Sequence, residues 1–133
     1  MVDGASRGNP GEAGCGAIIF DETGVVLKEL SRYLGHATNN VAEYEGLLMG
    51  LDGVLGLGGK RLQVQSDSQL LVRHLNGLYR VKDDKLRRLY QKALGLLHQL
   101  EAYRIIHVAR EHNRLADQLA NRALDDALRL GNH

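Results

Sequence analysis

The chain has 133 residues, 44% of them apolar and 25% charged, which predicts one globular domain over residues 1–133 with its own core. Its formal net charge of +1 gives no general sign of a nucleic-acid-binding protein. No apolar run reaches the roughly 18 residues that span a bilayer, and no signal peptide is visible, so no membrane partner is expected.

The first part of the chain predicts β-structure. A short first strand ends at Asp3, at a turn, and the β-rich runs 14–21 and 24–35 form a hairpin. Cys15, the only cysteine, is expected to be small core filler. A lone cysteine also suits a reducing compartment, which favours a cytoplasmic location.

A helix is expected over residues 39–58, where apolar residues recur at helical spacing and Asn39 or Asn40 can serve as the N-cap. The second half then predicts, in order, a strand at 61–67, helices at 68–77 and 83–101, a strand at 103–110 and a helix at 114–130. This order indicates a mixed α/β domain that starts with a hairpin and continues through crossover connections.

One segment of the chain is strongly basic. Residues 73–92 contain seven Lys and Arg against two Asp, a net charge of +5 that leaves −4 for the rest of the chain. The segment is either a solvated helix face or a surface for a polyanion, and the charge pattern leaves both interpretations open.

Four acidic residues hold positions at which α/β proteins build their sites. Asp67 ends a predicted strand, Glu43 lies one turn into a helix, and Asp117 lies in the first turn of the last helix. With Asp3 they come from four separate segments that can converge at one edge of the sheet. Such a cluster repels itself unless hard divalent cations bind it, and two ions can clamp the reacting oxygens of a phosphodiester. Each acid alone could instead cap a helix or compensate its dipole.

Other common site signatures are missing. The early glycines lead into no Gly-Lys-Ser/Thr, no glycine-rich turn opens a helix after the hairpin run, and the six histidines show no zinc-ligand spacing. Nucleotide-binding loops and zinc sites are therefore not expected.

Four segments together resemble the signature segments of type 1 ribonuclease H, in the order of that family: DGASRGNPG, TNNVAEYEGL, SDSQLLVRHLNG and HNRLADQLANRAL. The resemblance covers almost the whole chain and is to the short archaeal-type and bacterial members without a basic protrusion. It implies a ribonuclease H-like α/β fold with a five-stranded mixed sheet of order 3-2-1-4-5. Strand 2 would be antiparallel, and helices would cover both faces.

The resemblance also implies an activity. The family cleaves the RNA strand of RNA–DNA hybrids by a two-metal-ion mechanism and leaves 5′-phosphate and 3′-hydroxyl ends. Its catalytic, metal-binding carboxylates fall on Asp3, Glu43, Asp67 and Asp117, which would hold two Mg²⁺ ions, with Mn²⁺ as a substitute. The implied partner is the hybrid, with double-stranded RNA as a further candidate, and no feature demands more than a monomer.

Further residues match positions that bind substrate in the family. Asn9, Asn39 and Gln69 would contact sugars and base edges in the minor groove. Thr38 with His36 would grip a phosphate of the DNA strand. The complete set of expected substrate-binding residues is Gly4, Asn9, His36, Thr38, Asn39, Asn40, Gln69 and Lys82. Turn formation and helix capping are the structural alternatives for several of them.

Two positions depart from the family pattern. Asp83 stands where many members have an asparagine that contacts a DNA phosphate, so that contact would pass to Lys82. The loop before Asp117 is shorter than the loop that carries an auxiliary, product-releasing histidine in longer members. Arg110 or His112 could take that role, and the sequence leaves both open.

The first strand is also unusual, because only Met1 and Val2 precede Asp3, whereas the family has several residues there. The expectation is a shortened strand that lacks ladder hydrogen bonds and about two buried apolar side chains.

Three other functions compete with that of a hybrid ribonuclease. A non-catalytic hybrid-binding module of the same fold would be expected to have lost some of the four acids. A junction resolvase or an exonuclease would lack the Thr-Asn-Asn run before Glu43. A plain α/β interaction domain would leave all four signature segments as coincidence.

Overall fold

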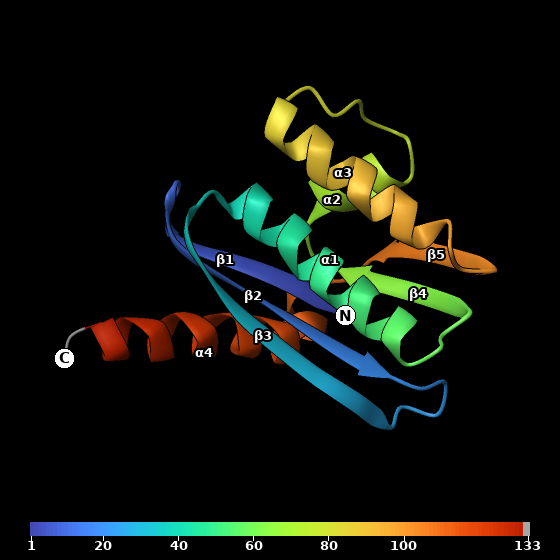
Figure 1. Ribbon diagram of the computed structural model, residues 1–133, viewed down its shortest axis with the longest axis horizontal. Helices are drawn as coiled ribbons and strands as arrows, with labels where there is room; N and C mark the ends of the chain where they lie inside the picture. The colour runs from blue at the N-terminus through green and yellow to red at the C-terminus, as the bar shows by residue number, and fades with distance from the viewer. Residues whose placement is uncertain (132–133) are drawn as a thin grey trace.

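The computed structural model describes residues 1–131. Within them the chain alternates strands and helices in a mixed α/β domain, as predicted (Figure 1). The elements in chain order are β1 (Val2–Gly8), β2 (Gly11–Phe20), β3 (Val26–Ala37), α1 (Asn39–Gly56), β4 (Arg61–Ser66), α2 (Gln69–Leu75), α3 (Asp84–Leu97), β5 (Ala102–His107), the 3-10 helix η1 (Arg110–Asn113) and α4 (Arg114–Gly131).

The strands follow the expected order, but in two adjoining sheets. β2 pairs antiparallel with β1 on one side and with β3 on the other, whereas β4 and β5 form a parallel pair. β1 lies beside β4 (Figure 1), yet no ladder of hydrogen bonds joins these two strands within residues 1–131. The β1–β2 ladder begins with Val2 opposite Ala17, so the last part of β2 has no β1 residue opposite it.

Two local predictions are corrected. Asp3 does not end the first strand, because β1 continues to Gly8 and pairs residue by residue with β2. The polar, glycine-containing sequence looks like a turn, but pairing with a neighbouring strand overrides local preference. The N-cap of α1 is Thr38, whose Oγ1 accepts a hydrogen bond from the Val41 backbone N–H at 3.2 Å, rather than either of the following asparagines.

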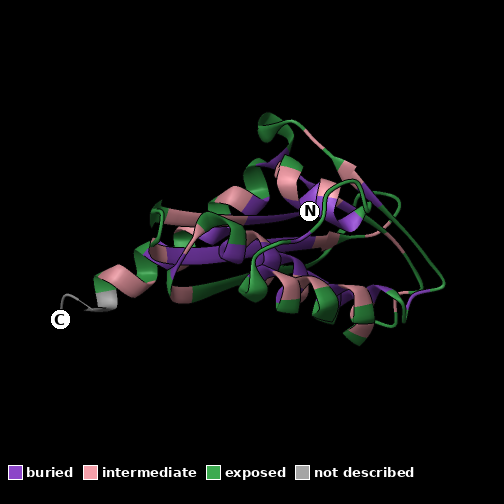
Figure 2. Ribbon diagram, turned by 90° about the horizontal axis from the view of Figure 1, so that it is seen from above, coloured by how far each residue is buried: buried purple, intermediate pink, exposed green. Residues whose placement is uncertain are grey.

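Helices cover both faces of the three-stranded sheet. α4 packs on one face and α1 on the other, and α3 packs on the outer side of α1. The buried residues are concentrated where the sheet meets these helices (Figure 2). Cys15 is fully buried on β2 beside α1, as predicted for a core filler. No helix within the described residues is both long and apolar enough to cross a membrane.

Candidate active site

Asp3 lies where β1 and α1 touch most closely, and it is only 4% exposed. A Cβ added at Gly46 of α1 would lie 2.7 Å from the Asp3 carbonyl oxygen. One added at Gly4 would lie 2.2 Å from the Ala42 carbonyl carbon. Neither distance leaves room for a side chain, so glycine at both positions allows the two backbones to touch. The contact brings Glu43, the neighbour of Ala42, alongside Asp3.

Asp67 reaches the same place from the end of β4. The buried hydroxyl of Ser66 accepts a hydrogen bond from the Ser68 backbone N–H at 3.0 Å. Ser68 in turn caps α2 by accepting from the Leu71 N–H at 3.2 Å. From the end of β5, the ring Nε2 of His107 lies 3.2 Å from the Asp67 carbonyl oxygen. These contacts hold the turn that carries the Asp67 carboxylate.

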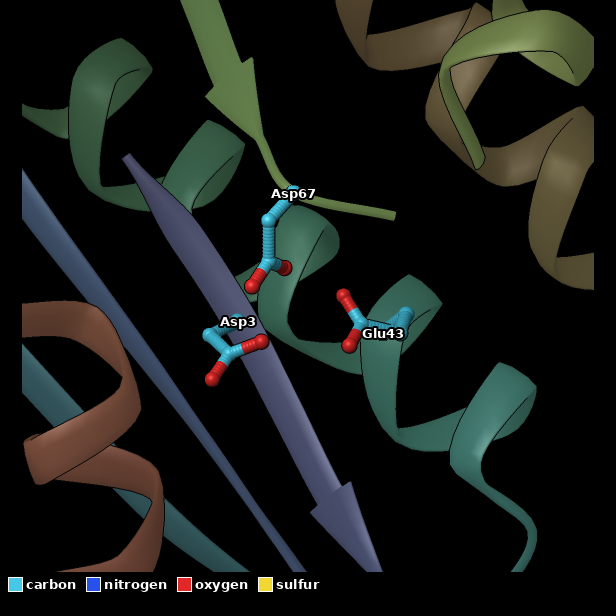
Figure 3. Close-up of side chains that lie close together, drawn as sticks. All are labelled: Asp3, Glu43 and Asp67. Atoms are coloured by element: carbon cyan, nitrogen blue, oxygen red, sulfur yellow. The ribbon is translucent and has the colours of Figure 1, made fainter. Parts of the chain in front are cut away.

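The carboxylates of Asp3, Glu43 and Asp67 point toward one another (Figure 3). Each offers one oxygen, and these oxygens all lie within 4.8 Å of one another. Asp117, in the first turn of α4, lines the same depression. The structure thus brings all four predicted acids to one edge of the sheet, while their catalytic roles stay a prediction.

Burial and neighbouring negative charge raise the pKa values of Asp3 and Glu43. Burial raises the pKa of Asp3 most, followed by the charge of Glu43, a hydrogen bond with Asp117 and the charge of Asp67. Burial also raises the pKa of Glu43, although its hydrogen bond with Asp3 opposes the shift. Asp3 and Glu43 therefore tend to retain protons at neutral pH unless positive charge is supplied beside them.

An unpaired oxygen of Glu43 indicates where a positive charge could bind. Glu43 as a residue is half-buried, but its Oε2 is fully buried and has no hydrogen-bond partner among residues 1–131. Buried polar atoms are almost always paired, so this oxygen is ready to accept a ligand. The atoms around it are carboxylate oxygens, which hard divalent cations prefer. The donor set therefore fits a divalent metal ion.

A small polar network forms the wall beside the acids. Asn39 Oδ1 accepts from the Ser6 backbone N–H at 2.8 Å, and the Asn39 backbone N–H donates to Asn9 Oδ1 at 3.1 Å. The two asparagines thereby tie the β1–β2 turn to the start of α1. The expected substrate-binding or auxiliary residues that line the depression are Gly4, Asn39, Asn40 and Arg110.

The other expected substrate-binding residues lie outside the lining of the depression. His36 is exposed on β3, and Thr38 caps α1 next to the Asn39 wall. Gln69 is exposed in the first turn of α2, and Lys82 is exposed just before α3. The structure therefore does not bring these four residues into the lining beside the acids, and their contacts with substrate stay a prediction.

The basic segment is partly structural. Asp83 is the N-cap of α3 and accepts from the Leu86 N–H at 2.9 Å, which gives this departure from the family pattern a role in the fold. Arg87 Nε donates to the Val81 carbonyl at 3.2 Å. The basic side chains of the segment that are exposed are those of Arg80, Lys82, Lys85, Arg88 and Lys92.

Position separates the two auxiliary candidates. Arg110 lines the depression together with the four acids, and it also lines a neighbouring hollow against Asp117. His112 is exposed in η1 and lines neither surface. The geometry therefore favours Arg110, and the auxiliary role itself stays a prediction.

Asn113 is a supporting residue that sequence reasoning missed. It is fully buried, and its Nδ2 donates to the Val2 carbonyl at 2.8 Å, which fastens η1 to β1 directly beside Asp3. The only sign of it in the sequence is an amide side chain shortly before the last helix. Such residues usually serve as caps at the surface, so the pattern gives no warning of a buried role.

This sheet order, with helices on both faces and acids gathered at one edge, defines a domain of the ribonuclease H-like class. The chain matches the family model described as "Reverse transcriptase-like" over residues 1–123. Comparison with individual proteins identifies the family within this class to which the chain belongs.

Two curated relatives are similar over nearly the whole chain. The bifunctional protein Rv2228c of Mycobacterium tuberculosis is 44% identical over 127 residues, which cover 95% of this chain and 35% of the relative. Ribonuclease HI of Halobacterium salinarum is 42% identical over 125 residues, which cover 94% of this chain and 63% of the relative. The chain therefore spans less than two thirds of the length of either relative.

Solved structures agree in fold and in size. RNase H1 from Halobacterium salinarum superposes with a TM-score of 0.92 at 41% identity and covers 94% of this chain and 95% of its own. The N-terminal RNase H domain of Rv2228c gives 0.94 at 43% identity, with 98% and 94% covered. LC11-RNase H1 in complex with an RNA/DNA hybrid gives 0.91 at 40% identity, with 96% of each chain covered. The chain belongs to the type 1 ribonuclease H family, which confirms the resemblance seen in the sequence.

Proposed function

We propose that the protein is an endonuclease that hydrolyses the RNA strand of RNA–DNA hybrids and leaves 5′-phosphate and 3′-hydroxyl ends. The observation that carries this proposal is the cluster of Asp3, Glu43 and Asp67 within 4.8 Å, with Asp117 in the same depression. A relative of similar size, LC11-RNase H1, has been crystallised with an RNA/DNA hybrid. A non-catalytic module would not need four acids close together, because burying like charges side by side costs free energy.

The four acids would hold two divalent cations, Mg²⁺ or in its place Mn²⁺. When bound, such ions activate a water nucleophile and neutralise charge that develops on the phosphate. The protein's own contribution is to bring the carboxylates together before any ion binds. The buried, unpaired Oε2 of Glu43 and the raised pKa of Asp3 are both consistent with a site built for positive charge.

The surrounding residues would position the hybrid. Asn39 and Gly4 line the depression, where amide and backbone groups can contact sugars and base edges of the minor groove. Asn9 supports Asn39 through its hydrogen bond, and Gln69 lies at the start of α2. Glu43 would lie near the RNA 2′-hydroxyl, the group that distinguishes RNA from DNA.

The remaining expected contacts would bind the DNA strand and the backbone. Thr38 and His36 would hold a DNA phosphate beside the start of α1. Lys82 and the exposed basic side chains of α3 would provide attraction to the polyanion that does not depend on sequence. Arg110 would assist at the carboxylate cluster. The proposal includes a cytoplasmic monomer, in line with the single buried cysteine.

The test is incubation of end-labelled RNA–DNA hybrid, double-stranded RNA and double-stranded DNA with the protein and Mg²⁺ or Mn²⁺. Internal cuts in the RNA strand of the hybrid are expected, and ligation assays should identify 5′-phosphate ends. Cleavage of DNA strands, or tight hybrid binding without cleavage with either ion, would contradict the proposal. The double-stranded RNA lane decides whether that duplex is a second substrate.

A further inference from the structure

A buried pair of side chains, Tyr44 and His74, lies between α1 and α2 and has no part in the chemistry described so far. Tyr44 is 1% exposed and His74 is 5% exposed. The Tyr44 hydroxyl oxygen lies 2.7 Å from His74 Nδ1, and the two rings stack with their centroids 6.0 Å apart. The other buried polar or charged residues in the described part of the chain are Asp3, Ser66 and Asn113. Each of these three belongs to the acid cluster or supports it, so only His74 has no role in the site described above.

The contact is a hydrogen bond between two uncharged groups. Burial lowers the pKa of His74 and raises the pKa of Tyr44, so the imidazole and the phenol both stay neutral at neutral pH. His74 Nδ1 can then accept a hydrogen bond from the Tyr44 hydroxyl. A hydrogen bond is restricted in both distance and angle, which an apolar contact is not. The pair therefore fixes how α1 and α2 lie relative to each other.

Each partner belongs to a helix that adjoins an acid. Tyr44 directly follows Glu43 on α1. Figure 3 shows Glu43 on this helix and Asp67 in the turn after β4. Ser68, the next residue, is the N-cap of α2, and His74 lies near the end of that helix. The hydrogen bond thus connects the helix that carries Glu43 with the helix that follows Asp67.

The position of α2 depends on a small number of directional contacts. This helix (Gln69–Leu75) is too short to be stable without contacts to the rest of the protein. On the β5 side, Asn76 Nδ2 donates to the Ile105 carbonyl at 3.2 Å. On the α1 side, the side-chain hydrogen bond in the described chain that joins the two helices is the one between Tyr44 and His74. Its loss would leave only apolar packing between α1 and α2.

Asp67 is the acid that a shift of α2 would move. Asp3 and Glu43 are held together by the β1–α1 backbone contact, in which α2 takes no part. Ser66 and His107 tie the Asp67 turn to β4 and β5 rather than to α1. The three acids offer oxygens within 4.8 Å of one another, and a bound metal ion tolerates only small displacements of its ligands. A small shift of α2 would therefore weaken ion binding without unfolding the protein.

We propose that Tyr44 and His74 are positioning residues, which fix α2 against α1 and so hold the Asp67 carboxylate at the distance from Glu43 that a divalent ion requires. They act on the ion only through the two acids. The proposal rests on the metal-dependent function proposed above, and it adds to that function the contact that sets the affinity for the ion.

A pair that only stabilises the core would behave differently on substitution. Removal of one partner leaves the other buried without a hydrogen bond, which lowers stability whatever the role of the pair. Replacement of both partners by apolar groups of similar shape leaves no unpaired group and costs little stability. Such a double replacement would preserve a purely stabilising role, whereas it would abolish a role that depends on the direction of the hydrogen bond.

Three variants separate stability from ion binding. Binding of Mn²⁺ is measured without nucleic acid, from the electron paramagnetic resonance signal of the free ion, and melting is measured without metal. Tyr44→Phe should melt at a lower temperature and bind Mn²⁺ about 10-fold more weakly, at the low end of the effect of groups that orient metal ligands. The double variant Tyr44→Phe/His74→Leu should melt close to the original chain, yet bind Mn²⁺ as weakly as Tyr44→Phe. His74→Asn places an amide group where Nδ1 lies, so it should melt at a lower temperature but keep the Mn²⁺ affinity of the original chain.

Val54→Ala is the control, because Val54 is buried on the same helix about three turns beyond Glu43. It should melt at a lower temperature with unchanged Mn²⁺ affinity. Unchanged affinity in Tyr44→Phe, or affinity that returns with stability in the double variant, would overturn the proposal. An equal loss of affinity in Tyr44→Phe and Val54→Ala would also overturn it. None of these measurements involves cleavage, so a chain that binds Mn²⁺ but cuts no hybrid would contradict the proposed nuclease function and leave the result on the pair unaffected.

Discussion

The two ends of the sheet differ in how completely the backbone is packed. At the end that carries the acids, β1 and α1 touch through Gly4 and Gly46, and the turn after β4 is held by hydrogen bonds. At the other end, Ile19 and Phe20 of β2 and the edge of β4 that faces β1 are unpaired in the described chain. The tight end confines mutually repelling charge, and the open end is apolar. The difference indicates that close backbone packing is concentrated where the acids must be held together.

The largest effect is expected from removing one charge at the tight end. Asp67→Asn should lower the cleavage rate by about 10³-fold or more, because the ions lose a carboxylate ligand. Affinity for the hybrid should change little, and gel-shift titration measures it. Asp52→Asn, at an exposed position on α1, is the control and should cleave normally. If the Asp67→Asn variant cleaved normally, Asp67 would not be a metal-binding residue.

The next largest effect is expected from separating β1 from α1. Gly4→Ala adds a Cβ that meets the α1 backbone, so the unfolding free energy should fall by about 1–3 kcal/mol or more. Activity should fall further than stability explains, because Glu43 moves away from Asp3. Gly95→Ala on α3 is the matched control, since its Cβ meets nothing within 4 Å and should add about 0.5–1 kcal/mol. Equal denaturation midpoints for both variants would contradict the close approach of β1 and α1.

The raised pKa values of Asp3 and Glu43 predict a pH effect on the metal-free protein. The folded state keeps protons that the unfolded chain loses above about pH 5, so the acids make stability fall as pH rises toward 8. The lowered pKa of the Met1 amino group makes stability rise with pH instead. Because both the original chain and an Asp3 variant carry this amino group, its effect cancels when the two are compared.

Urea denaturation of the original chain and Asp3→Asn, in EDTA at pH 5 and pH 8, makes that comparison. The variant should gain stability relative to the original chain as pH rises. Mg²⁺ or Mn²⁺ should restore the stability of the original chain at pH 8. A stability difference that does not vary with pH would show that the acids are ionised without metal.

The smallest effect is expected from the exposed basic side chains. Replacement of Lys82, Lys85 and Arg88 by Gln should weaken hybrid binding, because fewer phosphates of the hybrid are neutralised. The slope of log affinity against log salt should fall by about one for each such phosphate. The control replaces Lys60 and Arg61, which are exposed at the start of β4, and should leave the slope unchanged. Equal slopes for both sets of variants would show that the basic segment is only a solvated helix face.

Much of the fold could be predicted because its signals are local. Helical spacing located α1, α3 and α4 to within a few residues, and the position of Asp67 after a strand placed its carboxylate at the edge of the sheet. The predicted gathering of four acids was also possible, since strand ends and first helical turns meet there. Cys15 between two glycines correctly indicated a small buried residue.

What could not be predicted depends on contacts between distant segments. The length of β1 comes from pairing with β2, which its polar sequence does not announce. Thr38 rather than Asn39 caps α1 because Asn39 is already bonded to Ser6 and Asn9. The hydrogen bond from Asn113 to Val2 and the missing β1–β4 ladder likewise depend on how the strands are arranged in space.

The hydrogen bond from Asn113 to Val2 joins residues 111 positions apart. Asp3 and Asp117 therefore meet only when η1 and α4 have docked against β1. During synthesis the ribosome makes Asp3 long before Asp117, so a growing chain has no complete set of acids until α4 emerges. The order of residues along the chain thus delays assembly of the four acids until α4 has been made.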